Sequence, residues 1–256
     1  MPIKTKVLEK ISNILYCFSP EHPVWTATEL SKKLSIPVTT LHGILADLVT
    51  LDFLEQDKYS KTYKIGFRFI EMGELFTNNF ELNNIAHGFM RDLTSRVETL
   101  VGLSIIHKNW MYVSMSTLPS KISNSTRYVG PKILAHNSTG GKVILAHLPV
   151  EQQQKYLSSV KENALLPSDF DETVFLEELV QIRQQGYACL WNDGEKDIPL
   201  SIAAPIFGRE RQILASLVVI TPYQGMTPDK IPSIKQNLLE SANQITLRCG
   251  HISFNF

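Results

Sequence analysis

The chain contains little cysteine. Its 256 residues include three, Cys17, Cys189 and Cys249, which lie far apart and form no Cys-x-x-Cys pair. This usage argues against a disulfide framework and is typical of reduced thiols. Three histidines, His107, His136 and His147, do not fall at zinc-ligand spacing, and no cysteine is close to them in sequence. We therefore expect neither a metal site nor a cofactor.

Long apolar runs are absent as well. The segment from Met1 to Lys10 has no apolar core of signal-peptide length. No run elsewhere approaches the roughly 20 residues that a membrane-spanning helix needs. We therefore expect a cytoplasmic protein with no membrane partner.

Neither sign of charge is in excess over the whole chain. There are 25 basic and 25 acidic side chains, so no global field indicates a polyanionic partner. Residues 1–70 carry nine basic and seven acidic side chains, which leaves a net charge of plus two in that part. This weak polarity has the sign that a nucleic-acid partner would require, although an unremarkable charge distribution would look much the same.

Sequence motifs of catalysis are missing too. The chain has no nucleophile elbow, P-loop, Rossmann fingerprint or paired-histidine motif. Its composition, 43% hydrophobic and 20% charged, is that of an ordinary globular protein and argues against disorder. Enzyme activity has no positive support, and we expect that the protein is not an enzyme.

Two short helices are predicted between residues 26 and 50. Thr26 and Glu29 have capping-box spacing, which indicates the start of the first helix. Ser35-Ile36-Pro37 ends it, and Pro37 favours the first turn of the next helix. In the second helix the apolar residues recur at helical spacing, at Leu41, Ile44, Leu45 and Leu48. Its other face carries almost no bulk, which suits entry into the major groove of DNA.

A basic hairpin is predicted directly after these helices, from Phe53 to Gln56 and from Thr62 to Ile65. Together the elements predict a winged helix-turn-helix domain over residues 1–66. The expected DNA-binding residues are Thr28, Lys32, Lys33, Val38, Thr39, Thr40, His42, Gly43, Lys58, Lys61 and Lys64. The alternatives are an exposed helix face with no partner and a hairpin whose lysines only increase solubility.

The rest of the chain divides into a helix and an α+β domain. Residues 67–81 read as a linker helix whose side chains are apolar on more than one side, which predicts dimerisation through the amino-terminal half. Residues 82–256 begin and end with amphipathic helices. Between them, neighbouring strands alternate with further helices, which indicates a mixed or antiparallel sheet.

Five motifs in this order resemble the IclR family of bacterial transcriptional regulators, over about residues 6–250. They are Pro37-Val38-Thr39-Thr40-Leu41-His42-Gly43-Ile44-Leu45, Tyr63-Lys64-Ile65-Gly66, Ala135-His136-Asn137-Ser138-Thr139-Gly140-Gly141-Lys142, Ile182-Arg183-Gln184-Gln185-Gly186-Tyr187-Ala188 and Ser201-Ile202-Ala203-Ala204-Pro205-Ile206. The resemblance implies a GAF-like effector domain, a small-molecule effector that often carries a carboxylate, a homodimer or homotetramer, and a double-stranded DNA operator.

The departures from the family pattern affect both expected sites. Val38 and Gly43 stand where the family usually has Lys and Arg, so two basic contacts with DNA are missing. Ser201 replaces the usual Cys beside the effector pocket. Val218 and Ile220 stand where relatives often have serines, which makes that wall more apolar. The effector is therefore expected to be an aromatic or medium-chain carboxylate.

The resemblance also implies a set of effector-binding residues. They are Val129, Leu134, Ser138, Thr139, Gly140, Gly141, Trp191, Asp193, Ser201, Val218 and Ile220. The small residues from Ser138 to Gly141 are expected to leave room for a ligand and to offer it free N–H groups, or else Ser138 or Thr139 simply caps the helix. Asp193 lies in a loop that is either a ligand contact or a solvated acidic segment. Trp191 either stacks on a ligand or is buried against the sheet.

These observations predict a DNA-binding transcriptional regulator whose affinity for its operator is modulated by a small metabolite. One alternative is a ligand-binding or enzymatic GAF-like module that uses a vestigial winged helix for oligomerisation. Another is an interaction protein that binds no ligand. The sequence does not choose between an activator and a repressor.

Overall fold

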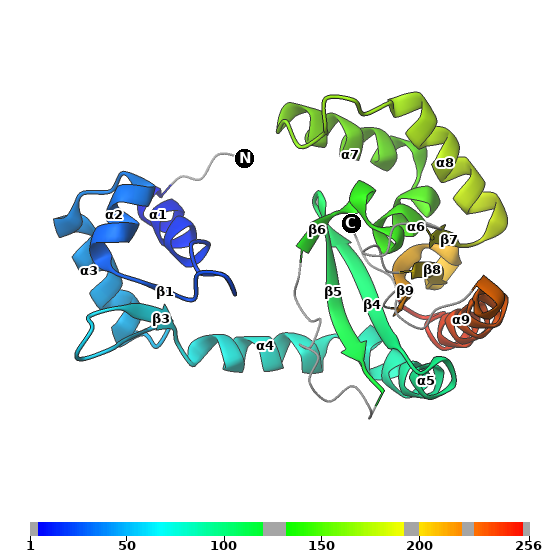
Figure 1. The fold of residues 1–256 in the computed structure, drawn as a ribbon, viewed down its shortest axis with the longest axis horizontal. Helices are drawn as coiled ribbons and strands as arrows, with labels where there is room; N and C mark the ends of the chain where they lie inside the picture. The colour runs from blue at the N-terminus through cyan, green and yellow to red at the C-terminus, as the bar shows by residue number, and fades with distance from the viewer. Residues whose placement is uncertain (1–4, 120–131, 192–199, 222–227, 253–256) are drawn as a thin grey trace. The chain divides into compact units, whose positions relative to one another are not determined.

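The structure is a computed structural model that describes residues 5–119, 132–191, 200–221 and 228–252. The chain forms two compact units, Met1–Asn79 and Phe80–Phe256 (Figure 1). Each unit has its own core of buried apolar side chains. In the described parts of the chain, no helix is both long and apolar enough to cross a bilayer.

The first unit is a winged helix-turn-helix followed by a helix. Its elements are α1 (Lys6–Leu15), β1 (Val24–Trp25), α2 (Ala27–Leu34), α3 (Val38–Thr50), β2 (Leu54–Gln56), β3 (Tyr63–Ile65) and α4 (Arg68–Asn79). The three strands form an antiparallel sheet in the order β1-β3-β2. Leu30, Leu41 and Leu45 are fully buried between the helices and the sheet.

Local hydrogen bonds fix the angle between α2 and α3. The Thr26 hydroxyl accepts from the Glu29 backbone N–H at 3.2 Å, while the Glu29 carboxylate accepts from the Thr26 N–H at 2.7 Å, so the predicted capping box is present. At the other end of α2, Ser35 adopts a left-handed conformation with φ 54°. The Ser31 hydroxyl then donates to the Ile36 carbonyl at 2.6 Å, which secures the turn before Pro37.

The second unit is built on a curled antiparallel sheet. Its strands are β4 (Leu100–His107), β5 (Trp110–Thr117), β6 (Lys132–Leu134), β7 (Ala188–Leu190), β8 (Leu200–Phe207) and β9 (Ile213–Thr221). Its α-helices are α5 (Glu81–Val97), α6 (Thr139–His147), α7 (Val150–Glu162), α8 (Glu172–Gln185) and α9 (Ile231–Arg248). The strand order is β6-β5-β4-β9-β8-β7, and every described pair is antiparallel. The predicted α+β architecture is therefore confirmed, with an antiparallel rather than a mixed sheet.

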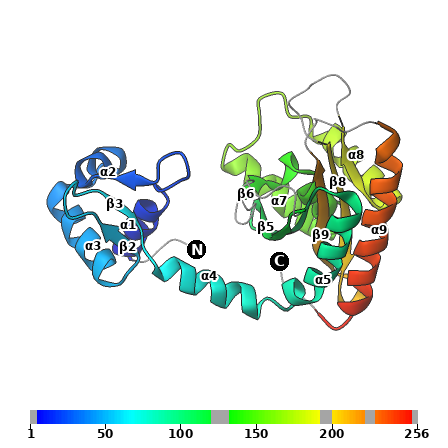
Figure 2. The ribbon, with the colours of Figure 1, turned by 60° about the horizontal axis from the view of Figure 1, so that its bottom comes forward.

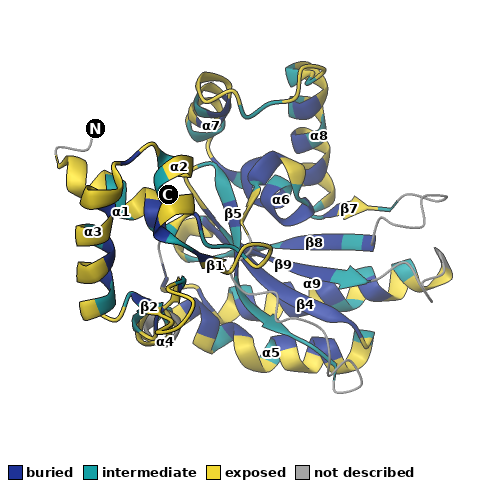
Figure 3. Ribbon diagram, turned by 60° about the vertical axis from the view of Figure 1, so that its left-hand side comes forward, coloured by how far each residue is buried: buried dark blue, intermediate teal, exposed yellow. Residues whose placement is uncertain are grey.

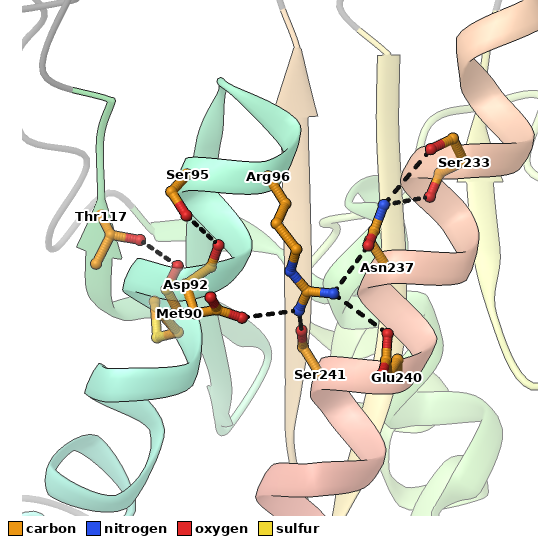
Figure 4. Close-up of polar contacts among 9 residues, drawn as sticks. All are labelled: Met90, Asp92, Ser95, Arg96, Thr117, Ser233, Asn237, Glu240 and Ser241. Atoms are coloured by element: carbon orange, nitrogen blue, oxygen red, sulfur yellow. Dashed lines mark hydrogen bonds and ion pairs between the residues drawn. The ribbon is translucent and has the colours of Figure 1, made fainter.

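One face of the sheet is covered by α5 and α9, which run side by side (Figure 2). Arg96 of α5 joins the two helices: its guanidinium donates to the Asn237 side chain at 2.9 Å and to the Ser241 hydroxyl at 2.9 Å (Figure 4). It also pairs with Asp92 and Glu240. Ser241 is fully buried, so this bond satisfies a hydroxyl that would otherwise lack a partner.

The other face is covered by α6, with α8 packed against α6 and side chains of α7 in the same buried core. The central strands β8 and β9 are buried on both sides, as Figure 3 shows by their colour. Residues of β9 alternate between the two cores: Leu217 and Val219 face α5 and α9, whereas Val218 faces α6. This alternation decides which residues can share a site.

Two of the shortest strands have no signal in the sequence. The strands β1 and β6 were not predicted, because each is only two or three residues long and depends on a distant partner.

Candidate DNA-binding and effector sites

The outer face of α3 is exposed and carries small side chains. Val38, Thr39, Thr40, His42 and Gly43 are all exposed, as expected for a face that could meet DNA. The opposite face carries the buried leucines that hold α3 against the unit, and Figure 3 shows both faces. Around Gly43 a Cβ atom would meet no heavy atom within 4 Å, so the helix surface there is open.

The wing between β2 and β3 is a rigid turn. One oxygen of the Asp57 carboxylate accepts from the N–H groups of Tyr59 at 2.9 Å and Ser60 at 2.7 Å, and these bonds, that of Ser60 first, lower the pKa of Asp57. Lys58 and Lys61 are exposed at this turn. The turn also presents Tyr59, whose side chain is 96% exposed and which the sequence analysis did not select.

The lysines of the first unit differ in whether a nearby carboxylate compensates their charge. Lys64 pairs with Glu55 at 2.8 Å, and hydrogen bonding to that carboxylate raises the pKa of Lys64, so its charge is partly compensated. Lys33 lies over the ring of Trp25 at 4.7 Å, with its ammonium still exposed. Lys32 and Thr28 are exposed on α2. All eleven expected DNA-binding residues thus lie at the surface of the first unit.

The start of α6 is tightly packed against the sheet. The Ser138 hydroxyl accepts from the Gly141 N–H at 3.0 Å, so Ser138 caps the helix, as the simpler alternative proposed. The Ser216 hydroxyl donates to the Gly140 carbonyl at 3.0 Å. A Cβ on Gly140 would lie 2.8 Å from a methyl carbon of Val218.

The expectation that the two glycines leave room for a ligand is therefore wrong. A Cβ on Gly141 would lie 2.2 Å from the Ala135 carbonyl oxygen, so this glycine is needed where α6 meets the preceding turn. Gly140 is needed because α6 lies directly on β9. Gly141 lets the α6 backbone lie close to the backbone of Ala135, and Gly140 lets it lie close to β9. Thr139, the first residue of α6, is also largely buried.

Part of the expected effector site lies along one row of the sheet. Ser201 of β8 pairs with Ile220 of β9, which pairs with Leu100 of β4. Ser201 and Ile220 are half-buried on the face that α6 covers. Two rows further along the sheet, Ser116 of β5 pairs with Gly102, which pairs with Val218, and the Ser116 hydroxyl is buried with no hydrogen-bond partner. A buried hydroxyl without a partner suits a polar ligand atom, and no sequence pattern singled out Ser116.

Two expected effector residues lie elsewhere. Leu134 of β6 pairs with Trp110, which pairs with His107, whereas Ile220 pairs with Leu100 at the other end of β4. Trp191 packs against the core that faces α5 and α9, because it follows Leu190 and side chains alternate along a strand. The structure therefore separates both residues from Ser201. Val129 and Asp193 lie outside the described residues.

His136 is part of a buried aromatic cluster. The Tyr156 hydroxyl lies 2.7 Å from Nδ1 of His136 and accepts from the His136 N–H at 3.0 Å. Burial lowers the pKa of His136 and raises that of Tyr156 to about 12, so both side chains are neutral at pH 7. Lys142 pairs with Glu178 at 2.7 Å, which supports a structural role. Among the described residues, no three His, Cys, Asp or Glu side chains are grouped to hold a metal.

Comparison with known families decides the identity of the fold. A model of the bacterial transcriptional regulator IclR C-terminal domain matches residues 75–247, and a model of the IclR helix-turn-helix domain matches residues 7–58. The chain belongs to the IclR family of bacterial transcriptional regulators. The resemblance drawn from the five sequence motifs is thereby confirmed.

Individual IclR-family proteins resemble the chain over most of its length. It is 26% identical to the HTH-type transcriptional regulator KipR of Bacillus subtilis (strain 168), over 98% of this chain and all of KipR. It is 25% identical to the transcriptional repressor IclR of Escherichia coli (strain K12), over 87% and 82% of the two chains. An IclR homologue from Microbacterium hydrocarbonoxydans, crystallised with 4-hydroxybenzoate, has the same fold, with a TM-score of 0.75, 20% identity and coverage of 94% and 98%.

Proposed function

We propose that this IclR-family protein binds a double-stranded operator through α3 and the wing, and that a small organic acid bound by the second unit sets its affinity. The proposed DNA binding rests on the surface of α3, which is exposed and has small side chains, within a capped helix-turn-helix. Major-groove entry requires such a face, because a recognition helix reads base edges at close range. The names of the matched relatives support regulation rather than catalysis.

The proposed DNA contacts divide by role. The α3 residues Thr39, Thr40 and His42 are placed to reach bases or phosphates, whereas Lys32, Lys58 and Lys61 are placed for phosphates. With Val38 and Gly43 in place of basic residues, phosphate contacts outside α3 provide a larger share of the affinity. We assign Lys64 a smaller share, because Glu55 already compensates its charge.

The proposed effector site lies beside Ser201 and Ile220, near the start of α6. Ser201 and the unpartnered Ser116 hydroxyl offer hydrogen bonds, and Ile220 offers an apolar surface. The homologue crystallised with 4-hydroxybenzoate, an aromatic carboxylate, supports this ligand class. A ligand changes the DNA response only if it binds one arrangement of the protein better than another, and this differential affinity is the mechanism we propose.

A pair of substitutions at Gly43 tests the DNA-binding face. Gly43→Arg restores a basic side chain on open helix surface, so we expect about tenfold tighter operator binding and about 0.9 added to the magnitude of the slope of log K against log salt. Gly43→Ala adds about 1 kcal/mol of helix propensity and no charge, so we expect little change in affinity. The measurement is a gel-shift titration over a salt series, with DNA from upstream of the coding region.

The outcome separates charge from helix stability. If both variants tighten binding equally, helix propensity and not a phosphate contact is responsible. If Gly43→Arg leaves the salt slope unchanged, α3 does not face the phosphates as proposed. Absence of any salt-dependent binding by the unmodified chain, on DNA that spans the whole upstream region, overturns the proposed function.

We further propose that the protein is a homodimer, or a homotetramer built from dimers, through α4. Large apolar side chains are exposed on α4 and on Phe67, which precedes it: the exposed fractions are 69% for Phe67, 65% for Ile70 and 63% for Leu75. This is a large apolar surface for one helix. Ile70→Glu would place a charge in the buried centre of such an interface. We expect this substitution to raise the dimer dissociation constant by at least about tenfold, measured by analytical ultracentrifugation of the full chain.

Glu74→Gln on the same helix provides the control. Glu74 is exposed and acidic, so its substitution changes the charge of α4 without adding a charge to the apolar surface. We expect it to leave the association state unchanged. A dimer that tolerates Ile70→Glu, or an unmodified chain that is monomeric at high concentration, would rule out α4 as the interface.

A further inference from the structure

A cavity lies in the Phe80–Phe256 unit, away from the expected effector site. It has a volume of about 940 Å³ and is bounded by the β4–β5 turn, the end of α6 and the helix α7. Ser201 and Ile220 lie at the other end of the sheet, because Ile220 pairs with Leu100 and the turn begins after His107. The cavity therefore does not belong to the site already described.

The inner wall of this cavity is apolar. It includes Trp110 on β5, Leu145 and Leu148 at the end of α6, and the ring of Tyr156 on α7. The volume is at the upper end of the range, about 300–1,000 Å³, that is usual for pockets that hold small organic molecules. An apolar wall of this size favours a ligand with an aromatic or aliphatic body.

The rim of the cavity is basic. Lys108 and Lys155 line it, together with His107 and the Gln152 side chain, and none of its lining residues is Asp or Glu. Neither lysine forms an ion pair with a carboxylate in the described structure, in contrast to Lys142 and Lys161, which do. Glu151 and Glu162 also lie on α7 and line an adjoining shallow hollow that shares Lys155 and Ser159 with the cavity, but neither carboxylate forms an ion pair with Lys155 in the described structure. Unpaired cations above an apolar wall are complementary to an amphipathic anion.

We propose that this cavity is a second ligand site, specific for an organic anion that has one apolar body and one acidic group. The apolar body packs against Trp110, Leu145 and Leu148, and the acidic group is held by Lys108 and Lys155. The helix α6 runs between the two sites: its start lies against Ser216 and Val218, and its end forms the wall of this cavity. The proposal of this second site depends neither on DNA binding nor on ligand binding at the expected effector site.

Fluorescence titration of the full chain with 1-anilinonaphthalene-8-sulfonate tests the proposal, because this probe combines an aromatic body with one sulfonate. We expect saturable binding of one probe per chain. The double variant Lys108→Gln/Lys155→Gln should weaken binding at least tenfold. The control Gln154→Glu/Gln181→Glu changes the net charge equally at exposed positions outside the cavity and should leave binding within twofold.

Two further comparisons separate this cavity from other apolar surfaces. Gln152→Trp should narrow the cavity and weaken binding, whereas Gln154→Trp on the same helix should not. N-phenyl-1-naphthylamine, which lacks the sulfonate, should bind more weakly and should not respond to the lysine substitutions. Circular dichroism of each variant establishes that the fold is intact.

Several results would overturn the proposal. Unchanged probe affinity in the Lys108→Gln/Lys155→Gln variant would exclude the basic rim. Loss of binding in Ser201→Phe would show that the probe occupies the expected effector site instead. A change in sedimentation caused by Gln152→Trp, and not by Gln154→Trp, would show that the cavity is an interface between copies of the chain.

Discussion

Replacement of Thr40 and His42 by glutamate is expected to abolish operator binding and leave the fold intact. Both side chains are exposed on α3, so neither substitution disturbs the core. Each would place a negative charge against the phosphates or base edges. Each of the two lost contacts with DNA is worth about 1–3 kcal/mol, so together they contribute roughly 2–6 kcal/mol. Their loss weakens operator binding by about 30-fold or more. Fluorescence anisotropy with a labelled operator fragment, at fixed salt, provides the measurement.

A charge-matched control separates local contact from global repulsion. Gln181→Glu/Gln184→Glu adds the same two negative charges at exposed positions of α8, in the other unit. Screening limits long-range repulsion at physiological salt, since the Debye length is about 8 Å. We expect less than about threefold weakening in this control. Equal losses in the two double variants, or unchanged affinity in Thr40→Glu/His42→Glu, would reject α3 as the docking face.

The helix-turn-helix was predictable because its determinants are local. The capping box joins Thr26 to Glu29 across one turn, and the buried face of α3 repeats every three or four residues. The residues that make those interactions are only a few positions apart in the sequence. The wing was also predictable as a hairpin, although the role of Asp57 in holding its turn was not identified.

The features that were missed depend on long-range pairing. The strand β1 exists because Val24 and Trp25 pair with Lys64 and Tyr63, which lie far along the chain. The packing of Gly140 depends on Val218 of β9, and no local pattern reveals this contact. The sequence therefore suggested space for a ligand where the structure has helix-to-sheet contact.

Strand register explains why the expected effector site was only partly assembled. Ser201 and Ile220 pair directly, so a prediction that grouped them matches the sheet. Leu134 and Trp191 were included because of the family resemblance. Leu134 pairs at the other end of the sheet and Trp191 lies on its other face, and either displacement moves a side chain completely out of a site. The unpartnered Ser116 hydroxyl was missed because only burial distinguishes it from the many other serines.

Aromatic and medium-chain carboxylates, and not two- or three-carbon keto acids, are expected to stabilise the protein. Ile220 presents apolar surface beside Ser201, so a larger body gains free energy from burial that pyruvate or glyoxylate lacks. A ligand at 100 times its dissociation constant contributes about 2.7 kcal/mol. This corresponds to an increase in melting temperature of roughly 5–10 °C for a domain of this size. Thermal-shift assays should compare 4-hydroxybenzoate and octanoate with pyruvate and glyoxylate.

Two substitutions locate the bound acid. Ser201→Phe should fill the space beside Ile220 and remove the thermal shift, whereas Gln181→Phe on the exposed side of α8 should not. Ile220→Ser should reduce the shift with octanoate more than that with pyruvate, because it exchanges apolar surface for a hydroxyl. Both substitutions are compared in the Lys108→Gln/Lys155→Gln background, because the cavity lined by those lysines is itself proposed to bind an organic anion and would otherwise contribute to the shift. If only the keto acids stabilise the chain, or if Ser201→Phe retains the full shift, then the effector does not bind beside Ser201 and Ile220.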